Sequence, residues 1–141
     1  TSVAAIGVAA HECGHAVQDA KHYIPLKLRV AIVPVANIGS TLSFPLIMLG
    51  VFMSWNQTLI NIGILAFSLA LVFQLVTLPV EFDASRRALS ILRDGDMLAE
   101  DELAAARKVL FAAALTYVAA ALATFLQLLR LVLLFGNRSR D

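Results

Sequence analysis

Five consecutive residues near the start of the chain, His11-Glu12-Cys13-Gly14-His15, form an HExxH pattern. On a helix, residues i and i+4 lie one turn apart on the same face, so His11 and His15 can direct two imidazoles at one metal ion. Glu12 lies beside them and is placed to act as a general base rather than as a ligand. The spacing predicts hydrolysis of a peptide bond by a zinc-activated water, and it leaves the substrate open.

The composition places most of the chain in a lipid bilayer. Of the 141 residues, 60% are hydrophobic and 15% are charged, whereas soluble domains have about 45–50% and about 25%. The apolar residues form long uncharged runs, each long enough for a span of about 20 residues. The alternative is a soluble bundle, which would have to bury three such runs in a short chain. The net charge is +1 without a basic tract, so we do not expect a nucleic-acid partner.

We predict an all-α fold, an integral membrane helical bundle with about three transmembrane helices and one metallopeptidase domain over residues 1–141. Its parts are an HExxH helix over 1–22, spans over 30–55 and 59–80, a third-ligand helix over 81–95, and a helix over 98–135 that contains the third span. Pro34 and Pro45 should kink or break the first span. Gln18, Asp19 and Lys21 mark the polar end of the HExxH helix, which therefore packs on the bundle at one membrane face.

The spans also predict where a third ligand comes from. A catalytic zinc needs three protein ligands and one open position for water. Two crossings return the chain to the side of the HExxH helix, where Glu81 and Asp83 are the nearest carboxylates. Glu81 is favoured because it is the first carboxylate after the span and its side chain is longer than that of Asp83, which is the alternative. Most of the eleven basic residues lie on that side, so the positive-inside rule predicts a site that faces the cytoplasm.

Four further side chains could support the ligands or contact substrate: Asp83, Ser85, His22 and Arg86. His22 could donate to a transition-state oxyanion, and a histidine exposed at the interface is the more ordinary interpretation. Arg86 could pair with Asp83 or bind a substrate carboxylate, against the alternative of a side chain that faces solvent or lipid headgroups. Ser85 is a small neighbour of Glu81 that permits close helix packing.

Two segments, His11–Gln18 and Leu78–Ala88, together closely resemble the bacterial neutral zinc metallopeptidases of the membrane. More distantly they are similar to the heat-shock membrane proteases and the CAAX prenyl proteases. The resemblance covers most of the chain. It implies a membrane-embedded peptidase of the bacterial cytoplasmic membrane that acts on polypeptides, which we expect to be membrane-associated. It also implies Zn²⁺ held by His11, His15 and Glu81, with Glu12 as the catalytic base.

The chain departs from these families in two respects. The prenyl proteases have an aspartate four residues after the ligand glutamate, where this chain has Ser85. Members of the closer family carry a further N-terminal span and a polar segment ahead of the HExxH helix, and we expect that part of the family domain to be absent here. In related zinc peptidases this region supplies the strand that grips substrate. The chain can therefore bind zinc and yet hydrolyse peptides poorly.

Two other functions use the same motif. In an intramembrane protease of the site-2 type, the third ligand would be the aspartate of Asp94-Gly95, which lies here in a polar turn. In a non-catalytic membrane scaffold or metal-binding subunit, a structural zinc would take a fourth ligand from His22, Cys13 or Asp83. A closed coordination shell would distinguish this second alternative. Nothing in the sequence fixes the oligomeric state.

Overall fold

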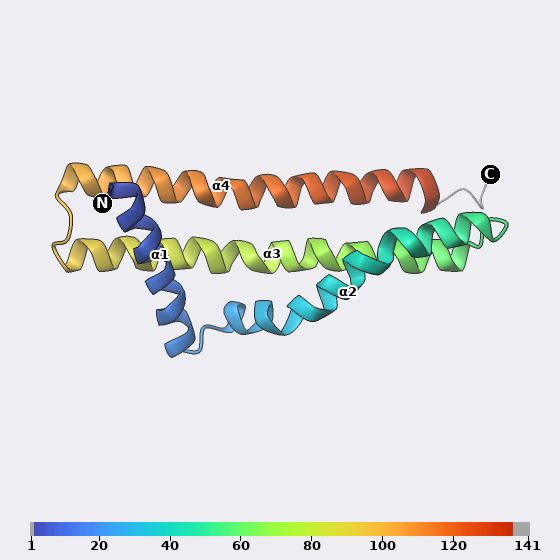
Figure 1. The fold of residues 1–141 in the computed structure, drawn as a ribbon, viewed down its shortest axis with the longest axis horizontal. Helices are drawn as coiled ribbons and strands as arrows, with labels where there is room; N and C mark the ends of the chain where they lie inside the picture. The colour runs from blue at the N-terminus through green and yellow to red at the C-terminus, as the bar shows by residue number, and fades with distance from the viewer. Residues whose placement is uncertain (1, 137–141) are drawn as a thin grey trace. The chain divides into compact units, whose positions relative to one another are not determined.

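The computed structural model describes residues 2–136, and over this range the chain forms helices and no strand. The elements are α1 (Val3–Ala20), α2 (Ile24–Phe52), α3 (Gln57–Asp94), α4 (Glu100–Leu131) and a π-helical turn (Val132–Gly136), as Figure 1 shows. The predicted all-α fold is confirmed. The chain divides into two compact units, of which unit 1 is Thr1–Leu28 with Val76–Ala119 and unit 2 is Arg29–Leu75 with Ala120–Asp141.

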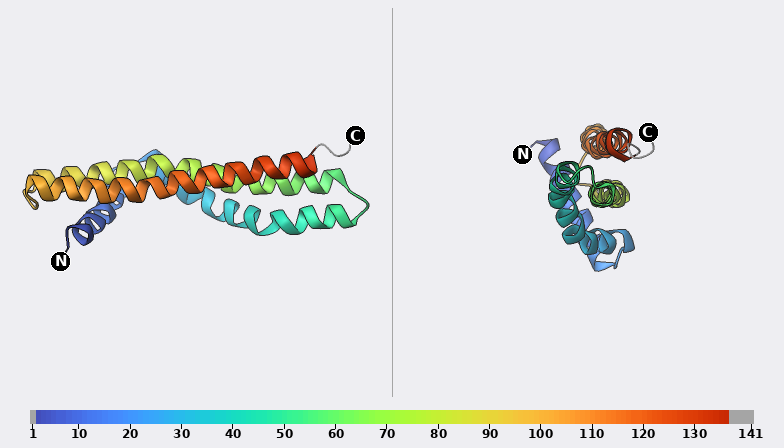
Figure 2. Two further views of the ribbon diagram at one scale, coloured as in Figure 1. Left: turned by 90° about the horizontal axis from the view of Figure 1, so that it is seen from above. Right: turned by 90° about the vertical axis from the view of Figure 1, so that its right-hand side faces the viewer.

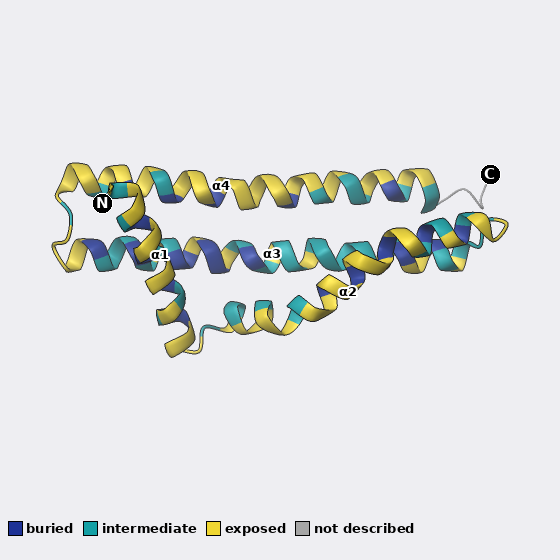
Figure 3. Cartoon of the chain, viewed as in Figure 1, coloured by how far each residue is buried: buried dark blue, intermediate teal, exposed yellow. Residues whose placement is uncertain are grey.

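Three helices, α2, α3 and α4, are long and apolar enough to cross a membrane. Each contains an 18-residue stretch with at most two charged residues, and no more than 22% of that stretch is buried. Figure 3 shows exposed residues along all three helices. Phe52 of α2 is 82% exposed and Leu65 of α3 is 67% exposed. Exposed apolar surface costs about 25 cal/mol per Å² in water, a cost that a lipid environment removes. Their length and composition therefore suit a bilayer.

The α1 helix begins with a side-chain cap and ends in a tight turn. The Oγ of Ser2 accepts a hydrogen bond from the backbone N–H of Ala5 at 3.1 Å, which satisfies one of the N–H groups that a helix start leaves free. After Ala20 the chain turns through His22, whose φ is 56°. This turn separates α1 from α2, which begins at Ile24, before the uncharged run.

Unit 1 combines α1 with the end of α3 and the start of α4. Its core consists of small and branched residues from all three helices: Ala10, Ala88, Leu92, Ala106 and Leu110. The end of α3 and the start of α4 run side by side in Figure 1 and in the views of Figure 2. The α1 helix crosses α3 at Gly14, where a Cβ would stand 2.3 Å from the backbone oxygen of Ala84. Only a glycine permits this approach.

Unit 2 is built on close packing of α2 against the first half of α3. A Cβ at Gly39 would stand 2.6 Å from the Ala66 oxygen, and one at Gly63 would stand 2.8 Å from the Ser43 oxygen. The Ser43 hydroxyl donates to the Gly63 carbonyl at 2.7 Å. The earlier residue of α2, Gly39, meets the later residue of α3, Ala66, and the later Ser43 meets the earlier Gly63, so the two helices are antiparallel. Small residues with a buried hydroxyl are the usual means of helix association in lipid, where apolar burial gives no driving force.

The α2 and α3 helices both continue through prolines. Pro34 and Pro45 lie inside α2, and the ribbon of α2 bends along its length (Figure 1). Pro79 lies inside α3, so the second predicted span and the predicted third-ligand helix form one continuous helix over Gln57–Asp94. A proline removes one backbone hydrogen bond, and the flanking turns tolerate this loss.

Candidate metal centre

Three side chains of unit 1 bring their ligand atoms together: His11 and His15 of α1 and Glu81 of α3. These atoms all lie within 4.8 Å of one another. The two Nε2 atoms are 3.0 Å apart. Glu81 Oε2 lies 2.8 Å from Nε2 of His11, and Glu81 Oε1 lies 3.4 Å from Nε2 of His15. The three residues are separated by up to 70 positions in the sequence, so the helix crossing creates the cluster.

The donor set fits a single metal ion. For nitrogen and oxygen ligands about 2.0–2.1 Å from a tetrahedral ion, neighbouring donor atoms stand about 3.3 Å apart. The two imidazole nitrogens are 3.0 Å apart, and the contacts of the carboxylate are 2.8 Å from Oε2 to His11 and 3.4 Å from Oε1 to His15, all within about 0.5 Å of this value. Glu81 is 4% exposed, and a buried carboxylate requires a partner of opposite charge or a coordinated cation. These three residues could therefore hold a metal ion.

His15 is held by a fully buried amide, the side chain of Gln18. Gln18 Nε2 donates to the Val80 carbonyl at 2.8 Å and to Asp83 Oδ2 at 2.9 Å. Because both partners are acceptors, the nitrogen of the amide must face them, and Oε1 must face Nδ1 of His15 at 3.0 Å. An amide oxygen only accepts, so Nδ1 carries the proton and Nε2 of the neutral ring keeps its lone pair for a metal ion.

His11 is oriented by a hydroxyl from α3. Its Nδ1 lies 3.0 Å from Ser85 Oγ. A proton on Nδ1 donates to this oxygen and leaves Nε2 free to coordinate. Ser85 lies one helical turn after Glu81 on α3, so both residues contact the His11 ring.

Asp83 and Arg86 belong to a surrounding ion-pair network and not to the donor set. Asp83 is buried and accepts from the guanidinium groups of Arg86 and of Arg87, the latter at 2.6 Å. The Arg87 guanidinium also lies 5.6 Å from the ring centre of Tyr23. The chain of contacts from the arginines through Asp83 and Gln18 reaches His15. Asp83 is thus connected to His15 through the amide of Gln18.

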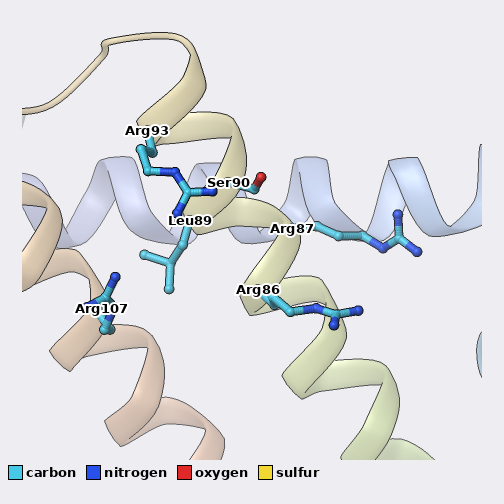
Figure 4. Close-up of a pocket in the computed structure, with 6 residues that line it drawn as sticks. All are labelled: Arg86, Arg87, Leu89, Ser90, Arg93 and Arg107. Carbon is cyan, nitrogen blue, oxygen red and sulfur yellow. The ribbon is translucent and has the colours of Figure 1, made fainter.

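A basic cavity of about 530 Å³ lies beside this network. It is lined by Arg86, Arg87, Leu89, Ser90, Arg93 and Arg107 (Figure 4). In Figure 4 the side chains of Arg86 and Arg87 extend away from those of Arg93 and Arg107. None of the three metal donors lines this cavity, so it is separate from the candidate metal centre.

Glu12 is exposed and adjacent to the donors on α1. At about 100° per residue, it lies about 60° around the helix axis from His15, on the side opposite to His11. The buried face of α1, which contacts α3, includes Gly14 and Gln18. Glu12 therefore lies on the exposed face of α1, away from the contact with α3.

The other donors considered from the sequence lie outside the cluster of three. His22 is exposed, and its backbone N–H bonds the Asp19 carbonyl. Cys13 is exposed. Asp94 lies 3.5 Å from the guanidinium of Arg93. Within residues 2–136, the one group of such side chains that could hold a metal ion is His11, His15 and Glu81.

Sequence reasoning missed the role of Gln18, which it placed at a polar helix end. Position 18 follows His15 by three residues and His11 by seven, so helical periodicity puts it on the ligand face. This spacing could have predicted that Gln18 lies beside the two histidines. The side chain is fully buried because three polar partners satisfy its amide.

Comparison with known proteins identifies the family to which this chain belongs. Residues 1–136 match the family described as "Putative neutral zinc metallopeptidase", and the chain belongs to this family. It is 48% identical over 136 residues to a protein named "Putative membrane protease YugP" from Bacillus subtilis (strain 168). The match covers 96% of this chain and 60% of that relative, so the chain spans little more than half of the relative's length. No solved structure matches the chain.

Proposed function

We propose that this protein is a zinc-dependent membrane endopeptidase that hydrolyses peptide bonds with a metal-activated water. The observation that carries the proposal is the convergence of two imidazole Nε2 atoms and a buried carboxylate within 4.8 Å. Glu12, exposed beside them, supplies the base. The family to which the chain belongs is named for this metal and this activity.

His11, His15 and Glu81 hold the metal, and the surrounding residues fix their orientation. Ser85 and Gln18 bond the Nδ1 atoms of the two imidazoles, which directs both Nε2 lone pairs to one point. Zinc, when bound, supplies Lewis acidity that polarises a carbonyl and lowers the pKa of a water to about 7. Three protein ligands leave one position open, as catalysis requires.

Glu12 moves the proton in both halves of the reaction. A carboxylate oxygen of Glu12 accepts a proton from water as the water oxygen attacks the carbonyl carbon of the substrate. The same oxygen then returns the proton to the amide nitrogen as the carbon–nitrogen bond breaks. The products are a carboxylic acid and an amine, and Glu12 regains its starting charge. Its exposure on α1 allows this exchange with a substrate.

The apolar helices direct the activity to polypeptides at a membrane. The α2, α3 and α4 helices suit a bilayer, and the relative from Bacillus subtilis is named as a membrane protease. The predominance of basic residues beside the HExxH helix and after α3's apolar run favours a site that faces the cytoplasm. We infer a membrane-associated polypeptide as substrate.

Three variants purified in detergent micelles test the proposal: Glu12→Gln, Glu81→Ala and, as a control, Asp94→Ala. Zinc is measured by mass spectrometry and cleavage by a fluorescence-quenched peptide library. Glu12→Gln should retain zinc and lose cleavage by about 10²–10⁴-fold, the contribution of a general base. Glu81→Ala should lose zinc, and Asp94→Ala should retain both properties.

The outcomes separate the alternatives. Full cleavage by Glu12→Gln, or full zinc content in Glu81→Ala, would overturn the assigned roles. Zinc loss in Asp94→Ala would favour the site-2 type of protease. Zinc held by four protein donors, with no position left for a water, would favour a non-catalytic metal-binding subunit.

A further inference from the structure

A second, smaller cavity of unit 1 adjoins the metal donors directly. Its volume is about 160 Å³. His11 and Glu81 form one wall, and the remaining wall includes Val8 of α1 with Leu110, Ala113 and Tyr117 of α4. Most of the lining surface is apolar. The cavity is thus an apolar recess whose polar end is the candidate metal centre.

We propose that this cavity binds one uncharged, leucine-sized side chain of the substrate, next to the peptide bond that is cleaved. The inference rests on the proposed peptidase function and adds a residue preference to it. The cavity shares His11 and Glu81 with the candidate metal centre. A peptide whose carbonyl lies at that centre would therefore have the adjoining side chain within reach of the cavity.

The volume limits the side chain. A cavity of about 150 Å³ lined by aliphatic residues binds one benzene molecule. A recess of about 160 Å³ therefore accepts a leucine, isoleucine or methionine side chain, and at most a single phenyl ring. The space exists because α4 presents alanines at positions 113 and 114 on this face. A larger residue at position 113 would fill it.

The charge of the lining limits the side chain further. Glu81 is the one charged lining residue, and its carboxylate already contacts Nε2 of His11 at 2.8 Å. A substrate aspartate or glutamate would lie beside this carboxylate and would lose its hydration without gaining a partner. An apolar side chain gains by leaving water, by about 10-fold or more in affinity for one of leucine size.

Binding of small hydroxamates tests the pocket without measuring catalysis. N-acetyl hydroxamates of glycine, leucine and aspartate are titrated by calorimetry into the zinc-loaded chain in detergent micelles. The leucine compound should bind about 10-fold or more tightly than the glycine compound. The aspartate compound should bind no more tightly than the glycine compound.

Two substitutions from different helices should remove this preference. Ala113→Phe and Val8→Phe both add bulk at exposed lining positions, so both should fold. Each should reduce the leucine advantage, the ratio of the affinities of the leucine and glycine compounds, to about one. Ala112→Phe is the matched control, because Ala112 is equally exposed on α4 and does not line the cavity. It should keep the full leucine advantage.

Failure of the pocket and failure of the metal centre give different results. If the glycine compound binds and leucine adds nothing, the pocket is overturned and the peptidase proposal stands. An acyl chain or another polypeptide segment would then be the occupant of the recess. If the zinc-loaded chain binds no hydroxamate, the open coordination position is absent, and both proposals are overturned.

Discussion

Gly14 of α1 lies against the backbone carbonyl of Ala84 in α3, so closely that a Cβ at position 14 would stand 2.3 Å from the oxygen. This contact lies between the two histidines on one helix and just after Glu81 on the other. It sets the separation of the helices that carry the donors. The fourth residue of the HExxH pattern is therefore constrained by packing as well as by the metal site.

Gly14→Ala should destabilise unit 1 and weaken zinc binding. The added methyl group would force α1 away from α3, at about 1–3 kcal/mol for an overpacked site, and would move both imidazoles from Glu81. Thermal unfolding in micelles and competition with a chelator measure the two effects. Gly7→Ala is the matched control, because its Cβ would meet Ala106 at an ordinary 3.8 Å. That variant should gain about 0.5–1 kcal/mol, and equal behaviour of the two would contradict the close contact.

Gln18→Met should weaken zinc binding by about 10–100-fold, the usual effect of losing the partner of a ligand histidine. Methionine keeps the buried volume and removes the acceptor for His15 Nδ1. Zinc affinity is measured by competition, and the visible spectrum of the cobalt-substituted protein reports the altered ligand geometry. Asp19→Ala, at the exposed next position, should leave both unchanged. An unaltered cobalt spectrum in Gln18→Met would show that the amide does not position the ligand.

Ser85→Ala and Ser85→Asp should have opposite effects on zinc affinity. Alanine removes the acceptor 3.0 Å from His11 Nδ1, and we expect about a 10-fold loss of affinity. Aspartate restores an acceptor and adds a negative charge that increases the basicity of the imidazole, so its affinity should equal or exceed that of the unsubstituted chain. The same competition assay compares them. Equal affinity of all three would exclude a contact between position 85 and the ligand.

Gly63→Ala should destabilise the helix pair of unit 2. Its Cβ would stand 2.7 Å from Cγ1 of the fully buried Ile47 and 2.8 Å from the Ser43 carbonyl. We expect a loss of about 1–3 kcal/mol in the free energy of unfolding, measured by denaturation in mixed micelles. Leu65→Ala on the same helix is the control, because a side chain that is 67% exposed should change stability by about 0.5 kcal/mol or less. If Leu65→Ala loses more free energy of unfolding than Gly63→Ala, the Gly63 face of α3 is not the face that packs on α2.

Removal of the metal should lower the thermal stability of unit 1. A ligand that binds only the folded state at 100 times its Kd adds about 2.7 kcal/mol, so a chelator should shift the unfolding temperature down by several degrees. Glu81→Ala lacks one of the three donors and should show little or no shift with the same chelator. A shift of equal size in this variant would mean that the metal binds elsewhere.

Much of the architecture could be predicted from two local features of the sequence, its uncharged apolar runs and the spacing of its histidines. The uncharged runs predict helices suited to a bilayer, and α2, α3 and α4 have that length and composition. The i, i+4 spacing predicts that His11 and His15 share a face of one helix. Two membrane crossings return the chain to the side of that helix, which predicts that Glu81 lies near the two histidines. The structure brings these three side chains together, although their roles stay predictions until the metal and the cleavage are measured.

The features that escaped prediction depend on contacts between distant segments. A glutamine at a helix end is ordinarily solvated, and Gln18 is buried only because Val80 and Asp83 of α3 accept from it. The apolar recess requires α4 to lie beside α1 and α3, which no local pattern states. The predicted division between the span over 59–80 and the helix over 81–95 is absent, because α3 continues through Pro79.

The 70 positions between His11 and Glu81 impose an order on biosynthesis. The two histidines leave the ribosome well before the carboxylate does, and this part of α3 must be synthesised before it can meet α1. A nascent chain therefore holds two of the three clustered side chains and not the third. If the cluster holds zinc as proposed, the complete site would form, and the proposed activity would begin, only after α3 has been made and has packed on α1.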